Sequence, residues 1–172
     1  MGIDLRILEF INEHIQNPVF DAAMPWITRL GNLGLLWIAV TVVLLCIKKY
    51  RRTGVVLAAA LVFVTVLGEL VLKPIVGRSR PFEGFLTIEL LIQAPMGYSF
   101  PSGHTLLGFT AATVLFLRDK RLGVAAGLVA LLIAFSRLYL NVHYATDVAA
   151  GILLGILCGW LVTFVFQRLK YL

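Results

Sequence analysis

Thr53-Gly-Val-Val-Leu-Ala-Ala-Ala-Leu-Val-Phe-Val-Thr-Val-Leu-Gly-Glu-Leu-Val-Leu72 is an almost unbroken apolar run whose one ionisable side chain is Glu69. A helix of about 20 apolar residues crosses the roughly 30 Å hydrocarbon core of a bilayer. In that medium each backbone N–H and C=O must find its partner within the chain, which favours an α-helix. The stretch therefore predicts a transmembrane helix and an all-α membrane fold.

Four more apolar runs are similar to it in length and composition. They lie at Asn32–Ile47, Ser102–Leu117, Leu122–Tyr139 and Tyr144–Phe166. The shortest of them predict local thinning of the bilayer or a recessed mouth. We therefore expect a polytopic helix bundle of five spans, or six if the more polar segment Val19–Leu30 also inserts.

The N-terminal residues have a different pattern. Apolar side chains recur at helical spacing between Ile3 and Gln16, which predicts an amphipathic helix lying along the membrane interface. Asn17-Pro18 ends it. Without a continuous apolar stretch behind a basic leader, a cleaved signal peptide is not expected. We expect a single domain over 1–172, with an N-terminal helical arm (1–31) and a catalytic membrane core (32–172).

The composition excludes an ordinary soluble domain. Of the 172 residues, 60% are hydrophobic and 14% are charged, and the mean hydropathy is +0.94. Soluble domains are nearer half apolar and a quarter charged. The formal net charge of +6 does not indicate nucleic-acid binding, because the basic residues flank apolar runs in short loops. Cys46 and Cys158 lie inside apolar runs and are expected to pack as small hydrophobic residues.

Three basic clusters predict the orientation of the chain. They fall within Lys48–Arg52, Arg118–Arg121 and Arg168–Lys170, and five spans put all three on one side of the membrane. Short loops rich in Lys and Arg stay in the cytoplasm. The opposite, exoplasmic face then holds Lys73–Pro101 and Arg137–His143, and these segments carry the residues capable of chemistry.

The segment from Lys73 to Pro81 presents several cations on the face where few are expected. Interfacial snorkelling explains a single Lys or Arg but not such a group. We interpret the segment as an anion cradle, in which Arg80 offers a planar guanidinium that matches phosphate oxygens and Lys73 adds a point charge. Pro74 and Pro81 would stiffen the loop that presents them.

Pro101-Ser-Gly-His104 opens the next apolar run. Ser102 is a preferred N-cap residue, and a helix N-terminus is an anion site because its free N–H groups point outward. Gly103 permits close approach of the backbone. The alternative is an ordinary cap followed by a chance histidine, so this motif depends on the other two.

His143 and Asp147 lie four residues apart at the start of the last run. On a helix they share a face, where the carboxylate can orient the imidazole and determine its tautomer. A nucleophile and its orienting group have this arrangement. An unrelated interfacial histidine would explain the pair alone, but Arg137 and the other two clusters make that alternative weak.

Together the three clusters resemble the signature of the type 2 phosphatidic acid phosphatase superfamily: K-x6-R-P, then P-S-G-H, then S-R-x5-H-x3-D. They match it without departure at Lys73–Pro81, Pro101–His104 and Ser136–Asp147. The resemblance covers the core from residue 32 onward, while the N-terminal arm is shorter than in six-span relatives. It implies an integral membrane phosphatase that needs neither a metal ion nor another cofactor.

The resemblance also implies a role for each residue. His143 would attack phosphorus and form a phosphohistidine, oriented by Asp147, while His104 would protonate the leaving oxygen. The phosphate oxygens would be held by five positions: Lys73, Arg80, Ser102, the backbone N–H of Gly103, and Arg137. Three cationic side chains would do the work of a metal ion, and the sequence has no carboxylate cluster suited to a hard metal.

The implied function is hydrolysis of a lipid phosphate or pyrophosphate at the exoplasmic face of the plasma (inner) membrane. Family substrates include undecaprenyl pyrophosphate, phosphatidylglycerol phosphate, phosphatidic acid and lipid A phosphates, and the small size and outward site favour the first. The expected partners are the lipid substrate and membrane lipids, with no nucleic acid and no obligate protein partner. Two alternatives stay open: a phosphatase or phosphotransferase for another phosphate ester, and a non-enzymatic anion or lipid transporter.

Three further features have two interpretations each. Arg78 either contacts a second phosphate or solvates its loop. Glu69, an ionisable group within a predicted span, is a functional candidate, and we expect it to pair with Lys73. The segment Phe82–Tyr98 either guides a lipid tail to the site or packs on the bundle, through its apolar residues Phe85, Leu86, Ile88, Leu90, Leu91 and Ile92.

Overall fold

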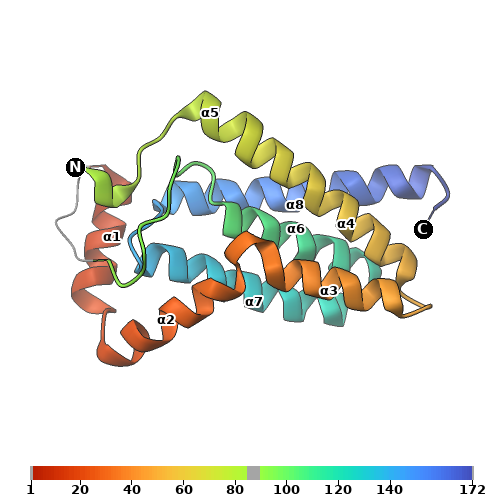
Figure 1. The fold of residues 1–172 in the computed structure, drawn as a ribbon, viewed down its shortest axis with the longest axis horizontal. Helices are drawn as coiled ribbons and strands as arrows, with labels where there is room; N and C mark the ends of the chain where they lie inside the picture. Colours follow the sequence, from red (N-terminus) through yellow and green to blue (C-terminus); the bar gives the residue numbers. More distant parts are fainter. Residues whose placement is uncertain (1, 85–89, 172) are drawn as a thin grey trace.

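A computed structural model describes residues 2–84 and 90–171, and every regular element in these ranges is helical (Figure 1). Phe85, Leu86 and Ile88, expected to guide a lipid tail, lie outside the described residues. All five predicted apolar runs form helices, which confirms the all-α class. The elements in chain order are α1 (Ile3–His14), α2 (Pro18–Leu30), η1 (Asn32–Gly34), α3 (Leu35–Cys46), α4 (Arg51–Thr65), η2 (Val66–Leu72), α5 (Lys73–Val76), η3 (Pro81–Glu83), α6 (Gly103–Arg118), α7 (Lys120–Tyr139) and α8 (Ala145–Arg168).

Helix α6 lies at the centre of the bundle and packs against α4, α7 and α8. Gly151, Gly155 and Gly159 recur every four residues along α8 and face it. A Cβ atom at Gly155 would come within 2.8 Å of the carbonyl oxygen of Leu106. Small residues let membrane helices approach closely, and van der Waals contacts then hold them where lipid removes the hydrophobic driving force. The glycines of α8 therefore determine how tightly the helix that carries Asp147 sits on α6.

The predicted span Thr53–Leu72 is helical throughout, but its helix is not regular. Helix α4 passes into the π-helical segment η2 and then into α5. A π-helical turn often accompanies a functional site. The loop toward Arg80 begins only at Gly77, whose φ of 61° suits glycine. Lys73 and Pro74 are thus helical, which corrects the expectation that both prolines of this motif stiffen a loop.

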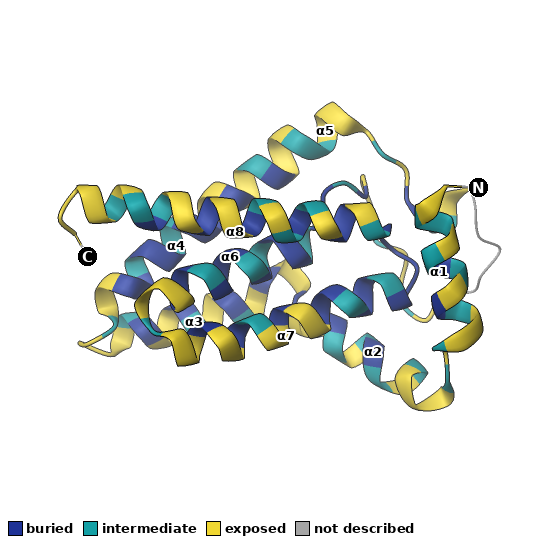
Figure 2. Cartoon of the chain, turned by 180° about the vertical axis from the view of Figure 1, so that it is seen from behind, coloured by how far each residue is buried: buried dark blue, intermediate teal, exposed yellow. Residues whose placement is uncertain are grey.

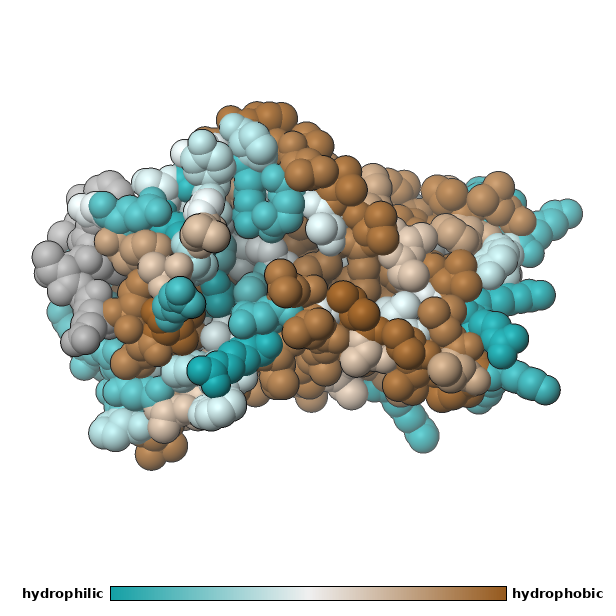
Figure 3. Space-filling view, in the orientation of Figure 1, coloured by the Kyte–Doolittle hydropathy of each residue, from teal (hydrophilic) through white to brown (hydrophobic). Residues whose placement is uncertain are grey.

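The outer surface of the bundle is apolar. Figure 2 shows exposed residues along the outward faces of the helices, and Figure 3 shows a hydrophobic band between two more polar ends. Large apolar side chains on this surface include Val62, Leu128 and Leu153, each at least 65% exposed. Exposing such a surface to water is unfavourable, whereas lipid chains solvate it. The chain is therefore a multi-pass membrane protein.

Three helical stretches are long and apolar enough to cross a membrane by themselves: Arg51–Glu83, Lys120–Tyr139 and Ala145–Arg168. Helix α2 and the segment Asn32–Cys46 pass the same test together, with a bend of 44° between them. Helix α6 has 16 residues and is not among these stretches. The count of five or six spans and the interfacial position of α1 therefore remain predictions.

The basic loops share one end of the bundle, as their positions between the apolar runs predicted. Lys49, Arg52, Arg118 and Gln167 line a single cavity there, which brings together the α3–α4 turn, the end of α6 and the end of α8. Polar side chains project from this end in Figure 3. The three sequence motifs lie at the opposite end of the helices, beside α1 and α2 (Figure 1).

The N-terminal arm covers the end that carries the motifs. The Tyr139 hydroxyl at the end of α7 donates a 2.6 Å hydrogen bond to Asp21 of α2 and accepts one of 3.1 Å from the N–H of Asn17. Asn12 of α1 exchanges side-chain hydrogen bonds with Asn141 in the α7–α8 loop. Arm and core therefore form one continuous structure at this end.

Candidate active site

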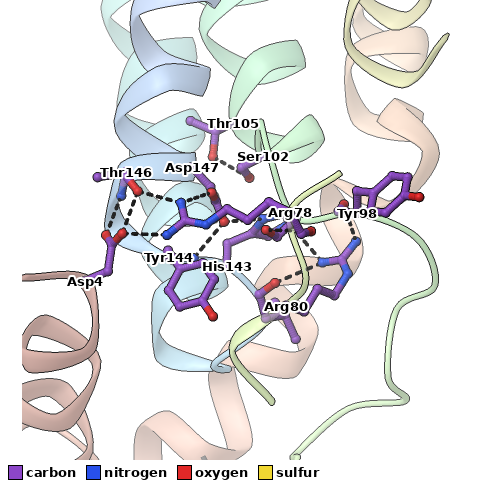
Figure 4. Close-up of polar contacts among 12 residues, drawn as sticks. Asp4, Arg78, Arg80, Tyr98, Ser102, Thr105, His143, Tyr144, Thr146 and Asp147 are labelled. Carbon is purple, nitrogen blue, oxygen red and sulfur yellow. Dashed lines mark hydrogen bonds and ion pairs between the residues drawn. The ribbon is translucent and has the colours of Figure 1, made fainter. Parts of the chain in front are cut away.

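The eight residues proposed from the sequence come from separate parts of the chain and lie at one end of the bundle. They are supplied by α5, the loop after it, the start of α6, the end of α7, the α7–α8 loop and the first turn of α8. In that order they are Lys73, Arg80, Ser102 with Gly103 and His104, Arg137, His143 and Asp147. Figure 4 shows the part of this group that surrounds His143.

His143 is 2% exposed and has a charged group on each side of its ring. Its Nε2 atom lies 3.3 Å from Nη1 of Arg80, and its Nδ1 atom lies 3.5 Å from Oδ2 of Asp147 (Figure 4). A guanidinium can only donate, so Nε2 must act as the acceptor and the proton resides on Nδ1. The second distance is long for a hydrogen bond, and Nδ1 has no hydrogen-bond partner among the described residues.

The surroundings of His143 keep its imidazole neutral. Burial is the main cause, and the positive charges of Arg137 and Arg80 act in the same direction, against the attraction of Asp147. Together they lower the pKa of His143 from 6.5 to about 3. At neutral pH Nε2 is therefore unprotonated, as a nucleophile requires, and its lone pair faces Nη1 of Arg80.

Arg80 is 3% exposed, and most of its donors are directed to the backbone rather than to open space. Nε donates to the carbonyl of Gly97 and Nη1 to that of Val142, each at 2.9 Å. Nη2 donates to the carbonyls of Met96 and Tyr98, at 3.2 and 3.3 Å. In this conformation Arg80 holds the loop around His143 together, and its predicted role as a direct phosphate ligand remains a prediction.

Asp147 is fully buried, and both of its oxygens accept hydrogen bonds. Oδ2 accepts from the N–H of Tyr144 at 2.9 Å, which caps the start of α8. Oδ1 accepts from Nη1 of Arg78 at 2.6 Å. Arg78 in turn donates from Nη2 to Oδ2 of Asp4 at 2.7 Å (Figure 4). The Asp147 carboxylate is thus held by a cation that the signature does not contain.

Arg137 and His104 line one cavity of about 640 Å³. Arg137 is 3% exposed; its Nη1 donates to the Thr28 hydroxyl at 2.6 Å, and its Nε has no partner among the described residues. His104 Nε2 lies 3.0 Å from Oδ1 of Asn32, which orients the ring. Leu90, Leu91 and Ile92 form an apolar part of the wall, and Arg29 adds a second cation. The cavity therefore offers both cationic donors and an apolar surface.

Ser102 has a different setting from the one expected, whereas Lys73 makes the ion pair that was predicted. Ser102 occupies the N-cap position of α6, yet its side chain makes no capping bond and accepts from the Thr105 hydroxyl at 2.9 Å. Its N–H donates to the carbonyl of Asp147 at 3.2 Å. Lys73 pairs with both oxygens of Glu69, at 2.6 and 2.7 Å, as predicted. A Cβ atom on Gly103 would lie 3.0 Å from that carboxylate, so glycine leaves room for the ion pair.

Four polar residues around the site were missed from the sequence: Asp4, Thr28, Asn32 and Thr146. They contact Arg78, Arg137 or His104 across separations of 68 to 109 residues, and Asp4 also contacts Thr146, 142 residues away. No spacing rule relates such distant positions. The only available signal was a set of polar side chains close to apolar helix ends. Within residues 2–84 and 90–171, no three His, Cys, Asp or Glu side chains gather as a candidate metal site.

Comparisons with known proteins agree with the arrangement of these motifs. Residues 49–171 match the sequence profile described as the PAP2 superfamily. The chain is 35% identical over 156 residues to an undecaprenyl-diphosphatase of Sulfolobus acidocaldarius, covering 90% of this chain and 74% of that protein. It is 33% identical over 168 residues to phosphatidylglycerophosphatase B of Bacillus subtilis, covering 91% and 80%.

The fold is also shared with a protein of known structure. The crystal structure of Aquifex aeolicus LpxE superposes with a TM-score of 0.83 at 31% sequence identity, over 95% of this chain and 96% of that one. The superposed portion includes the N-terminal arm that lies outside the matched profile.

Proposed function

This chain belongs to the PAP2 superfamily, and from that premise we propose that it hydrolyses a lipid phosphate or pyrophosphate through a phosphohistidine intermediate, without a metal ion. The observation that carries the proposal is the state of His143. It is buried and neutral, its Nε2 lone pair lies beside the cation of Arg80, and its Nδ1 proton faces Asp147.

In the first step, Nε2 of His143 attacks phosphorus in line with the leaving oxygen. The new N–P bond forms as the P–O bond to the lipid breaks, and the ring acquires a positive charge. Asp147 lies 3.5 Å from Nδ1, where it can stabilise the imidazolium. In the second step water attacks phosphorus, the N–P bond breaks, and inorganic phosphate leaves with neutral His143 restored.

His104 supplies the proton that the leaving oxygen needs, and accepts one from water in the second step. Its place in the cavity wall beside Arg137 supports this role, as does the hydrogen bond with Asn32 that orients its ring. The need for this proton depends on the substrate: a lipid monophosphate expels an alkoxide, which leaves poorly unless it is protonated, whereas a pyrophosphate expels a lipid monophosphate, which is less basic and needs the proton less.

Positive charge stabilises the transferring phosphoryl group. Its equatorial oxygens carry the charge of the transition state, and guanidinium donors match their geometry. The Nε of Arg137, which has no hydrogen-bond partner among the described residues, is one such donor. Arg80 adds a cation 3.3 Å from the attacking nitrogen. Lys73, Ser102 and the N–H of Gly103 complete the proposed phosphate site.

The cavity favours a lipid substrate over a soluble ester. A phosphate fits its cationic part, and the wall at Leu90, Leu91 and Ile92 can receive the first carbons of a lipid chain. Relatives are named undecaprenyl-diphosphatase and phosphatidylglycerophosphatase B. We favour an isoprenoid pyrophosphate among lipid phosphates, hydrolysed at the exoplasmic face of the cell membrane, because the basic loops lie at the opposite end of the helices.

The test is phosphate release in detergent from a panel of lipid phosphates, with EDTA present. The panel contains an isoprenoid pyrophosphate, phosphatidylglycerol phosphate, phosphatidic acid and a water-soluble phosphate ester. We expect release from a lipid substrate in EDTA, and its loss in His143→Ala with substrate binding retained. Binding without release by the wild type would favour a transporter, and transfer of phosphate to added alcohols in place of water would favour a phosphotransferase.

A further inference from the structure

Arg78 joins the candidate catalytic carboxylate to the N-terminal helix. Its Nη1 donates to Oδ1 of Asp147 at 2.6 Å and to the Thr146 hydroxyl at 2.7 Å, while Nη2 donates to Oδ2 of Asp4 at 2.7 Å. The guanidinium also lies over the ring of Tyr144, 3.9 Å from its centroid (Figure 4). Contacts on several sides therefore hold this side chain in one orientation.

Burial explains why Asp147 needs this cation. A carboxylate removed from water is costly unless a paired charge and hydrogen bonds compensate it. Asp147 has no exposed surface, and Arg78 is the basic side chain within ion-pair distance of its Oδ1 atom. Arg78 and the N–H of Tyr144 thus hold the carboxylate that faces Nδ1 of His143 in position.

Asp4 determines in turn where Arg78 lies. It receives Nη2 of Arg78 and also binds the first turn of α8, where Oδ1 accepts from the N–H of Thr146 at 2.9 Å. A carboxylate is favoured at a helix N-terminus. Burial tends to raise the pKa of Asp4, but hydrogen bonds from Arg78 and Thr146 outweigh it and lower the pKa below 3.8. Asp4 is therefore ionised at neutral pH.

We propose that Asp4 and Arg78 are positioning residues that hold Asp147 beside His143, so that the N-terminal helix α1 is part of the catalytic machinery. This inference rests on the proposed function, in which His143 is the nucleophile. It also gives Arg78 a role different from the two considered from the sequence. Its Nη groups are directed to Asp147, Thr146 and Asp4 rather than to a second phosphate or to water.

The kinetic signature of positioning differs from that of substrate binding. Arg78→Gln and Asp4→Asn should lower kcat and leave KM within about twofold, because neither residue touches the substrate. Displacing a catalytic group by about 1 Å can lower the rate about 100-fold. We therefore expect kcat to fall about 100-fold in Arg78→Gln and about 10-fold in Asp4→Asn, with partial recovery in Asp4→Glu.

A double-mutant cycle tests whether Asp4 acts through Arg78. If it does, Asp4→Asn should lower kcat further by less than about twofold once Arg78 is Gln, because coupled residues are not additive. Glu13→Gln is the matched control, since Glu13 is an exposed carboxylate on the same helix with no contact to the site. Thermal unfolding of each variant in detergent shows that the fold is retained.

The outcomes separate this inference from the proposed function. If His143→Ala is inactive while Arg78→Gln and Asp4→Asn match Glu13→Gln, the positioning role is wrong and the phosphatase mechanism stands. A rise in KM of about 10-fold with unchanged kcat in Arg78→Gln would make Arg78 a substrate ligand and overturn the inference. Independent, multiplicative effects in the double variant would also overturn it. Full phosphate release by His143→Ala would overturn both proposals together.

Discussion

Nε2 of His143 and Nη1 of Arg80 lie 3.3 Å apart, and the same guanidinium binds the backbone on both sides of that contact. One side is the carbonyl of Gly97 in the loop before α6, and the other is the carbonyl of Val142 next to the histidine. Arg80 therefore links the position of the imidazole to the position of two loops. Its planar fork with five donors allows this, whereas an ammonium offers one point charge.

Arg80→Lys should consequently impair both activity and stability. We expect kcat/KM to fall by about 100-fold or more, since a lysine cannot bind the loop carbonyls and lie beside Nε2 together. Leaving the buried carbonyl of Val142 without its donor should cost about 1–3 kcal/mol and lower the unfolding temperature. Steady-state kinetics and thermal unfolding in detergent measure the two effects. Arg118→Lys, at the opposite end of the bundle, should change neither, and a fully active Arg80→Lys enzyme would contradict this assignment.

His104→Ala should slow hydrolysis in proportion to the basicity of the leaving group. For an alkyl lipid phosphate we expect a loss of about 100- to 10,000-fold, as for removal of a general acid. For an aryl ester such as a nitrophenyl phosphate, whose leaving oxygen needs no proton, the loss should be below about 10-fold. The two rate constants are compared in one preparation of the variant. Equal losses for both substrates would show that His104 does not act as the acid.

Stability should decline as the pH falls below about 6.5, because the pKa of His143 is lowered to about 3 by burial and by the charges of Arg137 and Arg80. The unfolded chain binds a proton near 6.5, and the folded chain excludes it. The His143 contribution is thus complete above pH 6.5 and is lost as the pH falls toward 3. The steepest slope for one group is about 1.4 kcal/mol per pH unit. Unfolding temperatures measured between about pH 5 and 8, where most proteins are most stable, show this decline. His143→Gln should show a weaker dependence of the unfolding temperature on pH.

Gly155→Ala should loosen the contact between α6 and α8. The added methyl group would lie 2.8 Å from the carbonyl oxygen of Leu106. Because this oxygen belongs to the backbone of α6, it cannot easily move away. We expect a loss of about 1–3 kcal/mol, typical of overpacking. Gly127→Ala is the matched control, because nothing lies within 4 Å of its added Cβ atom and alanine is the better helix former. Thermal unfolding should therefore separate the two variants, and equal unfolding temperatures would contradict the close packing described here.

Much of the fold could be predicted from local properties of the chain. An apolar run near 20 residues has to be helical in lipid, so the five runs became helices with ends close to those expected. Charge in short loops likewise predicted that Lys49, Arg52 and Arg118 would meet at one end. The π-helical turn before Lys73 was not predictable, because it depends on how the end of that helix packs against its neighbours.

In the candidate site, too, the residues could be predicted from the sequence but most of their contacts could not. Motif spacing was enough to propose His143, Asp147, His104 and Arg137, since each motif lies at one helix end and its members are close along the chain. The hydrogen bonds that each side chain makes depend on partners from other helices. Arg80 was expected to bind phosphate, which stays a prediction, and in this conformation it binds four carbonyls. That choice follows from the shape of the surrounding loops.

By itself the sequence determined a helical membrane protein with phosphatase motifs gathered at one end, because apolar length, loop charge and helix periodicity are local quantities. Only the tertiary structure decided that Asp4, 143 residues before Asp147, shares Arg78 with it. A buried charge takes its partner from whatever side chain the packing brings within about 3 Å. The number of residues between two positions does not determine that distance, because it depends on how the helices pack.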